Sequence, residues 1–167
     1  MEKKFDIIIY GASGFTGSLG AKYIEKYTDK ISWAIAGRDF NKLQKLQEQL
    51  KSRPEIIVAD GTDEEALIKL TQSTKVVASY AGPFNKYSNL LVKACVKTST
   101  HYVDITGEAI WVRDLIDDYH QECIEKKIKI IPACGYDSIP SDIGTFFTAK
   151  QINEPLKSIF AYHSMAG

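Results

Sequence analysis

Three glycines spaced three residues apart near the start of the chain suit the binding of a phosphate group. They belong to the segment GASGFTG at residues 11–17, between an apolar run ending at Tyr10 and a stretch of helical character. Gly11 permits a tight turn, Gly14 lets a pyrophosphate approach the backbone, and Gly17 lets the helix pack closely on the strand. The helix N-terminus then offers free N–H groups to the phosphate. The predicted phosphate-binding residues are Gly11, Ser13, Gly14, Phe15, Thr16 and Gly17.

The residues after the second apolar run indicate which dinucleotide would bind. Sites for NAD place an acidic residue there, where it bonds the ribose 2′-hydroxyl. This chain has Gly37 at that position, followed by Arg38. A guanidinium group beside a small residue suits a 2′-phosphate, so the sequence predicts NADP(H). NAD is the alternative cofactor, with Asp39 turned towards the ribose and Arg38 as a surface side chain.

Two further segments follow predicted strands at the same edge of the sheet. Asp60 ends the third apolar run, where it could bond the adenine amino group or serve only as a turn residue. Ala81, Gly82 and Pro83 follow the fourth apolar run. Because ligands of doubly wound sheets lie across the carboxyl ends of the strands, these three residues are predicted to contact the cofactor.

Two loops later in the chain carry the candidate catalytic carboxylates. Glu108 follows the fifth predicted strand, and Asp137 follows the sixth. Both positions are predicted to lie near the nicotinamide, where a carboxylate could orient a substrate or pass a proton. The alternatives are an acidic residue at a helix N-terminus for Glu108 and turn chemistry around Pro140 for Asp137.

Taken together, five segments resemble the saccharopine dehydrogenase-like oxidoreductases, a family that includes trans-acting enoyl reductases. The segments are GASGFTG at 11–17, AGR at 36–38, AGPF at 81–84, HYVDITGE at 101–108 and DSIPSD at 137–142. The chain departs from the resemblance at Ser88 and Ser99, where glycine is usual. The resemblance implies an NAD(P)-dependent enzyme, a substrate domain beyond this chain, and lipid-droplet or membrane association of animal relatives.

Alternating apolar runs and helical stripes would position these residues. Strands are predicted at 5–10, 32–36, 55–60, 75–80, 101–105 and 128–133, with another at 158–165. Asp39 is predicted to cap the second helix and Thr62, with Glu65, the third. Strict alternation predicts an α/β fold, a doubly wound parallel Rossmann sheet with helices on both faces. Residues 1–152 would form the cofactor domain, and 153–167 would begin a second, substrate-binding domain.

Composition narrows the functional classes further. The formal net charge is zero, which does not favour nucleic acid as a partner, and no apolar run is long enough to span a bilayer. The three cysteines are not arranged as CxxC pairs, which fits reduced thiols in a cytoplasmic protein. No metal site is predicted, because the histidines and cysteines lack ligand spacing.

Three functions therefore compete. The leading prediction is an NADP(H)-dependent oxidoreductase that acts on a small-molecule or lipid-like substrate. The second is a non-catalytic sensor or scaffold that binds NADP(H). A short-chain dehydrogenase or sugar epimerase is disfavoured, because none of the nine tyrosines is followed four residues later by the lysine that such enzymes use.

Overall fold

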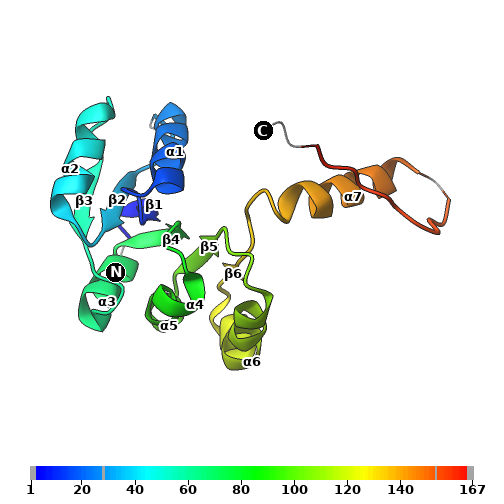
Figure 1. Cartoon of the computed structure of the whole chain (residues 1–167). Helices are drawn as coiled ribbons and strands as arrows, with labels where there is room; N and C mark the ends of the chain where they lie inside the picture. The colour runs from blue at the N-terminus through cyan, green and yellow to red at the C-terminus, as the bar shows by residue number, and fades with distance from the viewer. Residues whose placement is uncertain (1–2, 28, 153, 165–167) are drawn as a thin grey trace.

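The computed structural model describes residues 3–27, 29–152 and 154–164, and its centre is a sheet of six parallel strands (Figure 1). The strand order is β3-β2-β1-β4-β5-β6. The strands are β1 (Phe5–Tyr10), β2 (Trp33–Gly37), β3 (Glu55–Val58), β4 (Thr74–Ser79), β5 (His101–Asp104) and β6 (Ile130–Ile131). The order reverses between β1 and β4, which makes their carboxyl ends the switch point where such sheets bind ligands.

Helices cover both faces of this sheet (Figure 1). The helices are α1 (Phe15–Ile24), α2 (Phe40–Gln49), α3 (Glu64–Gln72), α4 (Phe84–Tyr87), α5 (Asn89–Lys97), α6 (Ala109–Lys126) and α7 (Ile139–Gln151), with a 3-10 turn, η1, at Glu25–Tyr27. One buried cluster joins the sheet to α1 and α2, and the other joins it to α3, α5 and α6. The predicted doubly wound α/β fold is therefore confirmed.

The central strands read as apolar runs because they are covered on both sides. Ile8, Ile9 and Ile35 are almost completely buried, and every residue of β2 is buried. Strands in the middle of a parallel sheet have no wet face, so they need no polar alternation. This explains why β1 and β2 could be predicted from short apolar runs.

Hydrogen bonds between neighbouring backbones continue beyond the ends of the strands and fix the loops that follow. Tyr10 of β1 pairs with Ala36 of β2 and Ser79 of β4. Beyond that point the N–H of Gly11 donates to the carbonyl oxygen of Ala36 at 2.9 Å, and the N–H of Tyr80 donates to that of Tyr10 at 2.8 Å. The loops after β1, β2 and β4 therefore begin side by side.

The predicted cap of the third helix was wrong by one residue. Asp63, rather than Thr62, is the N-cap of α3, and its carboxylate accepts from the N–H of Ala66 at 3.0 Å. Thr62 is engaged elsewhere, since its N–H and hydroxyl both donate to Asp60. The predicted cap of α2 is confirmed, because Asp39 accepts from the N–H of Lys42.

The last two predicted strands differ from the structure. The sixth strand is only Ile130–Ile131, shorter than the predicted 128–133, and it pairs with β5 alone. It stops before Pro132, which has no N–H to donate to a ladder. Residues 158–164 form no strand, since an extended segment needs a neighbouring strand to pair with. Met165 of that prediction lies outside the described residues.

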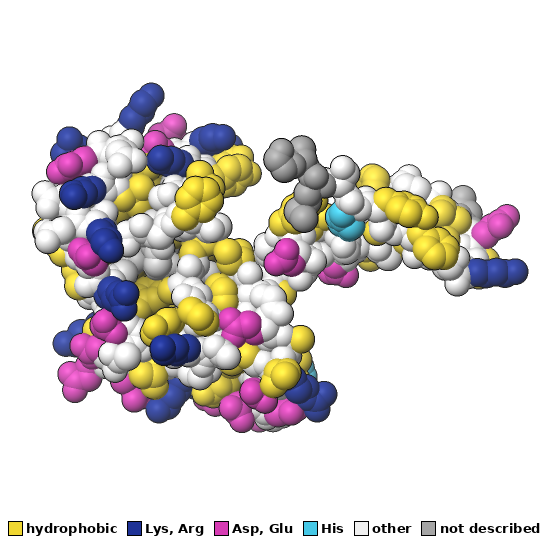
Figure 2. Space-filling view, viewed as in Figure 1, with side chains coloured by type: hydrophobic (Ala, Val, Ile, Leu, Met, Phe, Trp, Pro, Cys, Tyr) yellow, Lys and Arg dark blue, Asp and Glu magenta, His cyan; other side chains and the backbone are white. Residues whose placement is uncertain are grey.

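Helix α7 extends away from the sheet and buries none of its residues (Figure 1). Figure 2 shows hydrophobic side chains clustered over this arm of the molecule. They include Ile143, Phe146 and Phe147, each more than half exposed. Helix α7 therefore carries an exposed apolar surface, a feature that often marks an interaction site in proteins.

Candidate nucleotide-binding site

A pocket of about 440 Å³ opens at the carboxyl ends of β1 to β4. It lies at the switch point of the sheet, where doubly wound folds bind their ligands. Seven residues predicted to bind cofactor line it, namely Gly11, Ser13, Gly14, Arg38, Asp60, Ala81 and Gly82. The structure therefore gathers residues from four separate loops into one cavity.

The glycine loop needs its glycines for backbone reasons. Gly11 has a φ of +74°, a conformation that side chains rarely adopt, and a Cβ there would lie 2.9 Å from the N atom of Ala81. A Cβ on Gly14 would meet only the carbonyl oxygen of Gly11, at 3.4 Å. Gly11 thus shapes the turn, whereas Gly14 leaves open the space in front of the helix.

The first helix begins at this pocket without a side-chain cap. Its N-cap is Gly14, which has no side chain to accept a hydrogen bond, whereas α2 and α3 are capped by Asp39 and Asp63. The first N–H groups of a helix have no partner within the helix and carry its positive dipole end. An uncapped N-terminus facing a cavity is well suited to bind a phosphate.

Arg38 follows β2, Asp60 follows β3, and both line the pocket together with the glycine loop. Arg38 is exposed and lines the pocket, while the neighbouring Asp39 is committed to capping α2. The hydrogen bonds from Thr62 hold the pKa of Asp60 below its usual range, and the Arg38 guanidinium lowers that pKa further. No carboxylate stands at the end of β2, because Gly37 occupies that position.

Six lining residues were not among the predicted cofactor-binding residues, and all but Tyr87 lie within two residues of a predicted one. They are Tyr10, Gly37, Gly61, Thr62, Tyr80 and Tyr87. The Tyr10 hydroxyl donates to the carbonyl oxygen of Ala59 at 3.3 Å. Burial raises the pKa of Tyr10 to about 12, which keeps this hydroxyl protonated. For all but Tyr87, a position close to the predicted loop residues was the only available signal.

Four predicted cofactor residues lie outside the lining of this pocket. Phe15 is 85% exposed, and Thr16 is exposed beside it on the first turn of α1. Gly17 is buried against the backbone of Gly11. Pro83 lines a neighbouring hollow together with Glu108. Their N–H groups or packing, rather than side chains, would have to serve the site.

The two candidate catalytic carboxylates differ in their surroundings. Both oxygens of Glu108 accept hydrogen bonds at the start of α4, from the N–H groups of Phe84 at 2.7 Å and Asn85 at 2.9 Å. Asp137 is exposed just before α7. A Cβ on Gly107 would lie 3.9 Å from its Oδ2 atom, so the two late loops approach each other.

With this geometry in place, the comparison with known families is decisive. Residues 7–131 match the model described as the saccharopine dehydrogenase NADP binding domain. The chain belongs to this family. The match spans β1 to β6 and includes every loop that lines the pocket. The predictions of the family, of the Rossmann fold and of NADP as the cofactor are confirmed.

Two curated relatives show how this family member compares with longer proteins. It is 32% identical to a lipid droplet localized protein of Caenorhabditis elegans, over 95% of this chain and 39% of that protein. It is 36% identical to a trans-acting enoyl reductase of Mycobacterium tuberculosis, over 87% of this chain and 35% of that protein. The chain thus spans less than two fifths of either relative.

Solved structures agree on the fold. A saccharopine dehydrogenase from Saccharomyces cerevisiae superposes with a TM-score of 0.74 at 23% identity, covering 88% of this chain and 31% of that one. A triphenylmethane reductase from Citrobacter, solved with NADP(H), has a TM-score of 0.56 at 18% identity, covering 75% of this chain and 48% of that one. At these identities the likeness concerns architecture alone.

This saccharopine dehydrogenase-family domain has serine at two positions where glycine was expected. Ser99 has a φ of +53°, the left-handed conformation that glycine adopts most easily. Ser88 has an ordinary φ of −104° and is fully buried. Ser99 therefore carries a local backbone strain that glycine would avoid.

Asp104, at the end of β5, was not predicted but organises the two late loops of the domain. Its Oδ1 accepts from the N–H groups of Thr106 and Ala133, both at 3.0 Å, and its Oδ2 accepts from the Tyr102 hydroxyl at 2.8 Å. Burial raises the pKa of Asp104, although these hydrogen bonds act in the opposite direction. The only sequence signal was an aspartate two residues before a threonine, typical of a turn.

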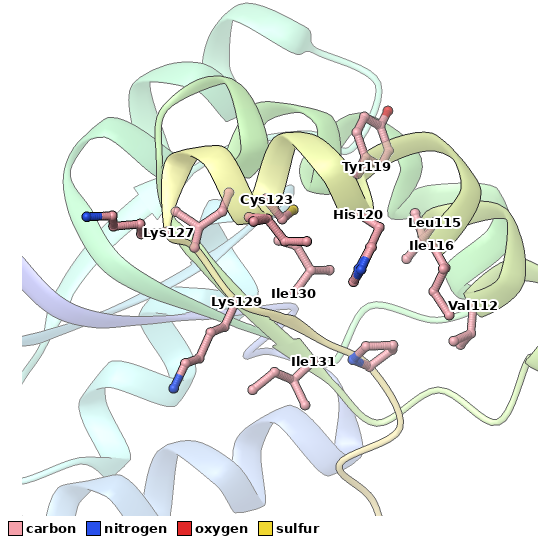
Figure 3. A pocket seen from close by; sticks show the side chains of 13 residues that line it. Val112, Leu115, Ile116, Tyr119, His120, Cys123, Lys127, Lys129, Ile130 and Ile131 are labelled. Carbon is pink, nitrogen blue, oxygen red and sulfur yellow. The ribbon is translucent and has the colours of Figure 1, made fainter.

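A larger hollow of about 600 Å³ lies between α6 and the edge strand β6 (Figure 3). It shares no lining residue with the nucleotide pocket. Its lining is mainly apolar and includes Leu115, Ile116 and Ile130. It has neither a glycine turn nor a helix N-terminus, so it lacks what holds a dinucleotide. Size alone therefore does not identify the cofactor site.

Within residues 3–27, 29–152 and 154–164, no three histidine, cysteine or acidic side chains are placed to share a metal ion. Over the same ranges, none of the helices has the length and apolar character needed to cross a membrane.

Proposed function

We propose that this chain is the cofactor-binding part of an NADP(H)-dependent oxidoreductase that acts on a lipid-related substrate. The observation that carries the proposal is the pocket at the switch point, which combines an uncapped helix N-terminus with Arg38. The names of the relatives, an enoyl reductase and a lipid droplet localized protein, support the reaction class and the substrate class.

Each part of the pocket has a proposed role. Gly11, Ser13 and Gly14, with the N–H groups of Phe15, Thr16 and Gly17, would hold the pyrophosphate. Arg38 would pair with the 2′-phosphate, because its planar guanidinium forms two charge-assisted hydrogen bonds with such groups. Asp60 would accept from the adenine amino group, and the backbone of Ala81, Gly82 and Pro83 would form the wall next to the reacting end.

Proton handling is assigned to Asp137. When bound, NADPH supplies a hydride, so reduction of a carbonyl or enoyl group also needs a proton. The Asp137 carboxylate is exposed, and no hydrogen bond from another described residue reaches it. It is therefore free to hydrogen-bond a substrate or pass a proton to it, whereas Glu108 already accepts two N–H groups.

The substrate side of the site is proposed to come from outside this chain. Residues 1–152 would form the cofactor domain, and residues 153–167 would begin a second domain that completes the pocket. The exposed apolar surface of α7 supports this division, because such a helix needs protein around it. A closed pocket is also required to exclude water and hold the substrate at reacting distance.

Cofactor oxidation tests the proposed activity. NADPH absorbance would be followed with this chain and with a longer form that carries the proposed second domain, against a panel of carbonyl and enoyl-lipid substrates. We expect NADPH binding by both forms and turnover only by the longer one. Binding without turnover by the longer form would instead support a sensor or scaffold. Equal turnover by the two forms would contradict the division into domains.

The proposal places the protein in the cytoplasm, at the surface of lipid droplets or membranes. It rests on the lipid droplet localized relative. Fractionation of cells that express the longer form would test it. Recovery of the protein with floating droplets is expected, and recovery only with the soluble fraction would contradict the association.

A further inference from the structure

A carboxylate outside the pocket holds the short helix that forms one of its walls. Helix α4 begins two residues after Gly82 and ends at Tyr87, and both of these residues line the pocket. Its N-cap is Pro83, which offers no side-chain hydrogen bond to the first turn. The two oxygens of Glu108 take over that function, since they accept from the N–H groups of Phe84 and Asn85.

Aromatic packing joins the same two segments. The Trp111 ring, on the first turn of α6, stacks with the Phe84 ring at a centroid distance of 6.0 Å, and both rings are buried. The Trp111 Nε1 atom also donates to Oδ1 of Asn89 at 2.6 Å, which ties α6 to α5. Helix α4 is therefore fixed to α6 by two kinds of contact, at Glu108 and at Trp111.

The position of Phe84 reaches the pocket through Gly82. A Cβ on Gly82 would lie 3.3 Å from the Cε2 atom of the Phe84 ring, so the ring packs closely beside Gly82. Gly82 and Ala81 line the pocket directly. A displacement of Phe84 would consequently move the pocket wall, because close-packed groups transmit strain.

Glu108 is itself held in place by the buried polar groups at the end of β5. Its N–H donates to Oγ1 of Thr106 at 3.0 Å, and the N–H of Thr106 donates to Asp104. Three successive hydrogen-bonded links therefore run from Asp104 through Thr106 and Glu108 to α4. They connect the loop after β5 with the loop after β4.

We infer that Glu108 is a positioning residue for NADP(H) binding: it fixes α4, and through Phe84 and Gly82 the wall of the cofactor pocket. The inference rests on the proposed use of that pocket. It assigns Glu108 a role at the neighbouring loop instead of at the reacting atoms. Asp114 lies on α6, the helix that Glu108 caps, and it lines the same hollow as Pro83 and Glu108. No hydrogen bond joins Asp114 to α4, so it offers a matched control.

Calorimetric titration of this chain with NADPH tests the inference in four forms: the parent, Glu108→Gln, Glu108→Ala and Asp114→Ala. Glu108→Ala should weaken binding about tenfold, the ratio that corresponds to one charge-assisted hydrogen bond. Glu108→Gln should lie in between, because its amide oxygen can still accept one N–H. Asp114→Ala should bind like the parent.

Amide hydrogen exchange of Phe84 and Asn85 supplies a reading that does not depend on cofactor. Both amides should exchange faster in Glu108→Ala and at parental rates in Asp114→Ala. If the parent binds NADPH and both Glu108 variants bind equally well, the inference fails while the proposed function stands. If the parent does not bind NADPH, the proposed function fails, and the inference fails with it. Circular dichroism confirms that each variant is folded.

Discussion

Gly17 of α1 rests directly against the carbonyl oxygen of Gly11, since a Cβ built on Gly17 would stand only 2.3 Å from that oxygen. The neighbouring Cα of Ala12 would be 2.9 Å away. Both obstacles are backbone atoms, which cannot move aside without displacing the turn. The close contact of helix and loop therefore depends on the absence of a side chain at Gly17.

Gly17→Ala should consequently destabilise the fold by about 1–3 kcal/mol, the usual cost of overpacking. It should also weaken NADPH binding, because the loop and the helix start must separate. Urea unfolding monitored by circular dichroism measures the first effect. Gly144→Ala is the control, since a Cβ there meets nothing within 4 Å. Equal stability of the two variants would contradict the argument.

Gly14→Val should act in the opposite way, abolishing dinucleotide binding while leaving the fold intact. Its Cβ meets only the oxygen of Gly11, at 3.4 Å, and the rest of the side chain would project into the pocket. Titration with NADPH and a thermal melt of the same sample separate the two effects. A folded variant that binds normally would show that the phosphate lies elsewhere.

Arg38→Ala should weaken NADPH binding by about 1.5–3 kcal/mol, as expected for a lost hydrogen bond to a charged group. NADH binding should barely change, because NADH lacks the 2′-phosphate. Calorimetric titration with both cofactors measures the difference. Lys45→Ala, at an exposed position of α2, controls for loss of a positive charge. Equal affinities of the unsubstituted chain for the two cofactors would refute the preference.

Ser99→Gly should stabilise the chain by about 1 kcal/mol, because a non-glycine residue in the left-handed region carries a strain of this order. The φ of +53° at Ser99 is the basis for this expectation. Chemical denaturation of Ser99→Gly and Ser99→Ala distinguishes backbone strain from loss of the hydroxyl. Alanine keeps the Cβ and should give no gain, so a similar gain in both variants would rule out strain.

Asp6 should make the fold sensitive to strong acid. The hydrogen bond from Lys75 and those from Ser32 lower the pKa of Asp6 from 3.8 to about 2. Because the folded-state pKa is depressed, the stabilisation is complete above pH 3.8 and is lost as the pH falls through about 2. Unfolding at several pH values should show a flatter acid limb for Asp6→Asn. An unchanged limb would contradict the assignment.

The sequence was sufficient for the parts of the fold with a local cause. Strand β2 and, apart from Asp6, strand β1 are apolar runs because both faces of the sheet are covered there, and the glycine turn after Tyr10 is recognisable by its spacing. Arg38 could be placed at the pocket because it directly follows the end of a strand. All three depend on a few neighbouring residues.

Features that depend on distant partners could not be predicted. The contact of Glu108 with Phe84 spans 24 residues, and that of Asp104 with Ala133 spans 29. A glutamate that caps another helix has the same sequence context as one that faces a substrate. The segment at 158–164 failed for a related reason, since strand composition without a partner strand gives no sheet.

The residues that line the nucleotide pocket and those that hold α4 are separated along the sequence, which bears on how the pocket forms during synthesis. The lining of the nucleotide pocket runs from Tyr10 to Tyr87, whereas the side chains that fix α4 belong to Glu108 and Trp111. On the ribosome, every residue that lines this pocket therefore emerges before Glu108 and Trp111, the two residues that hold α4. A nascent chain cannot complete this pocket until the beginning of α6 has followed.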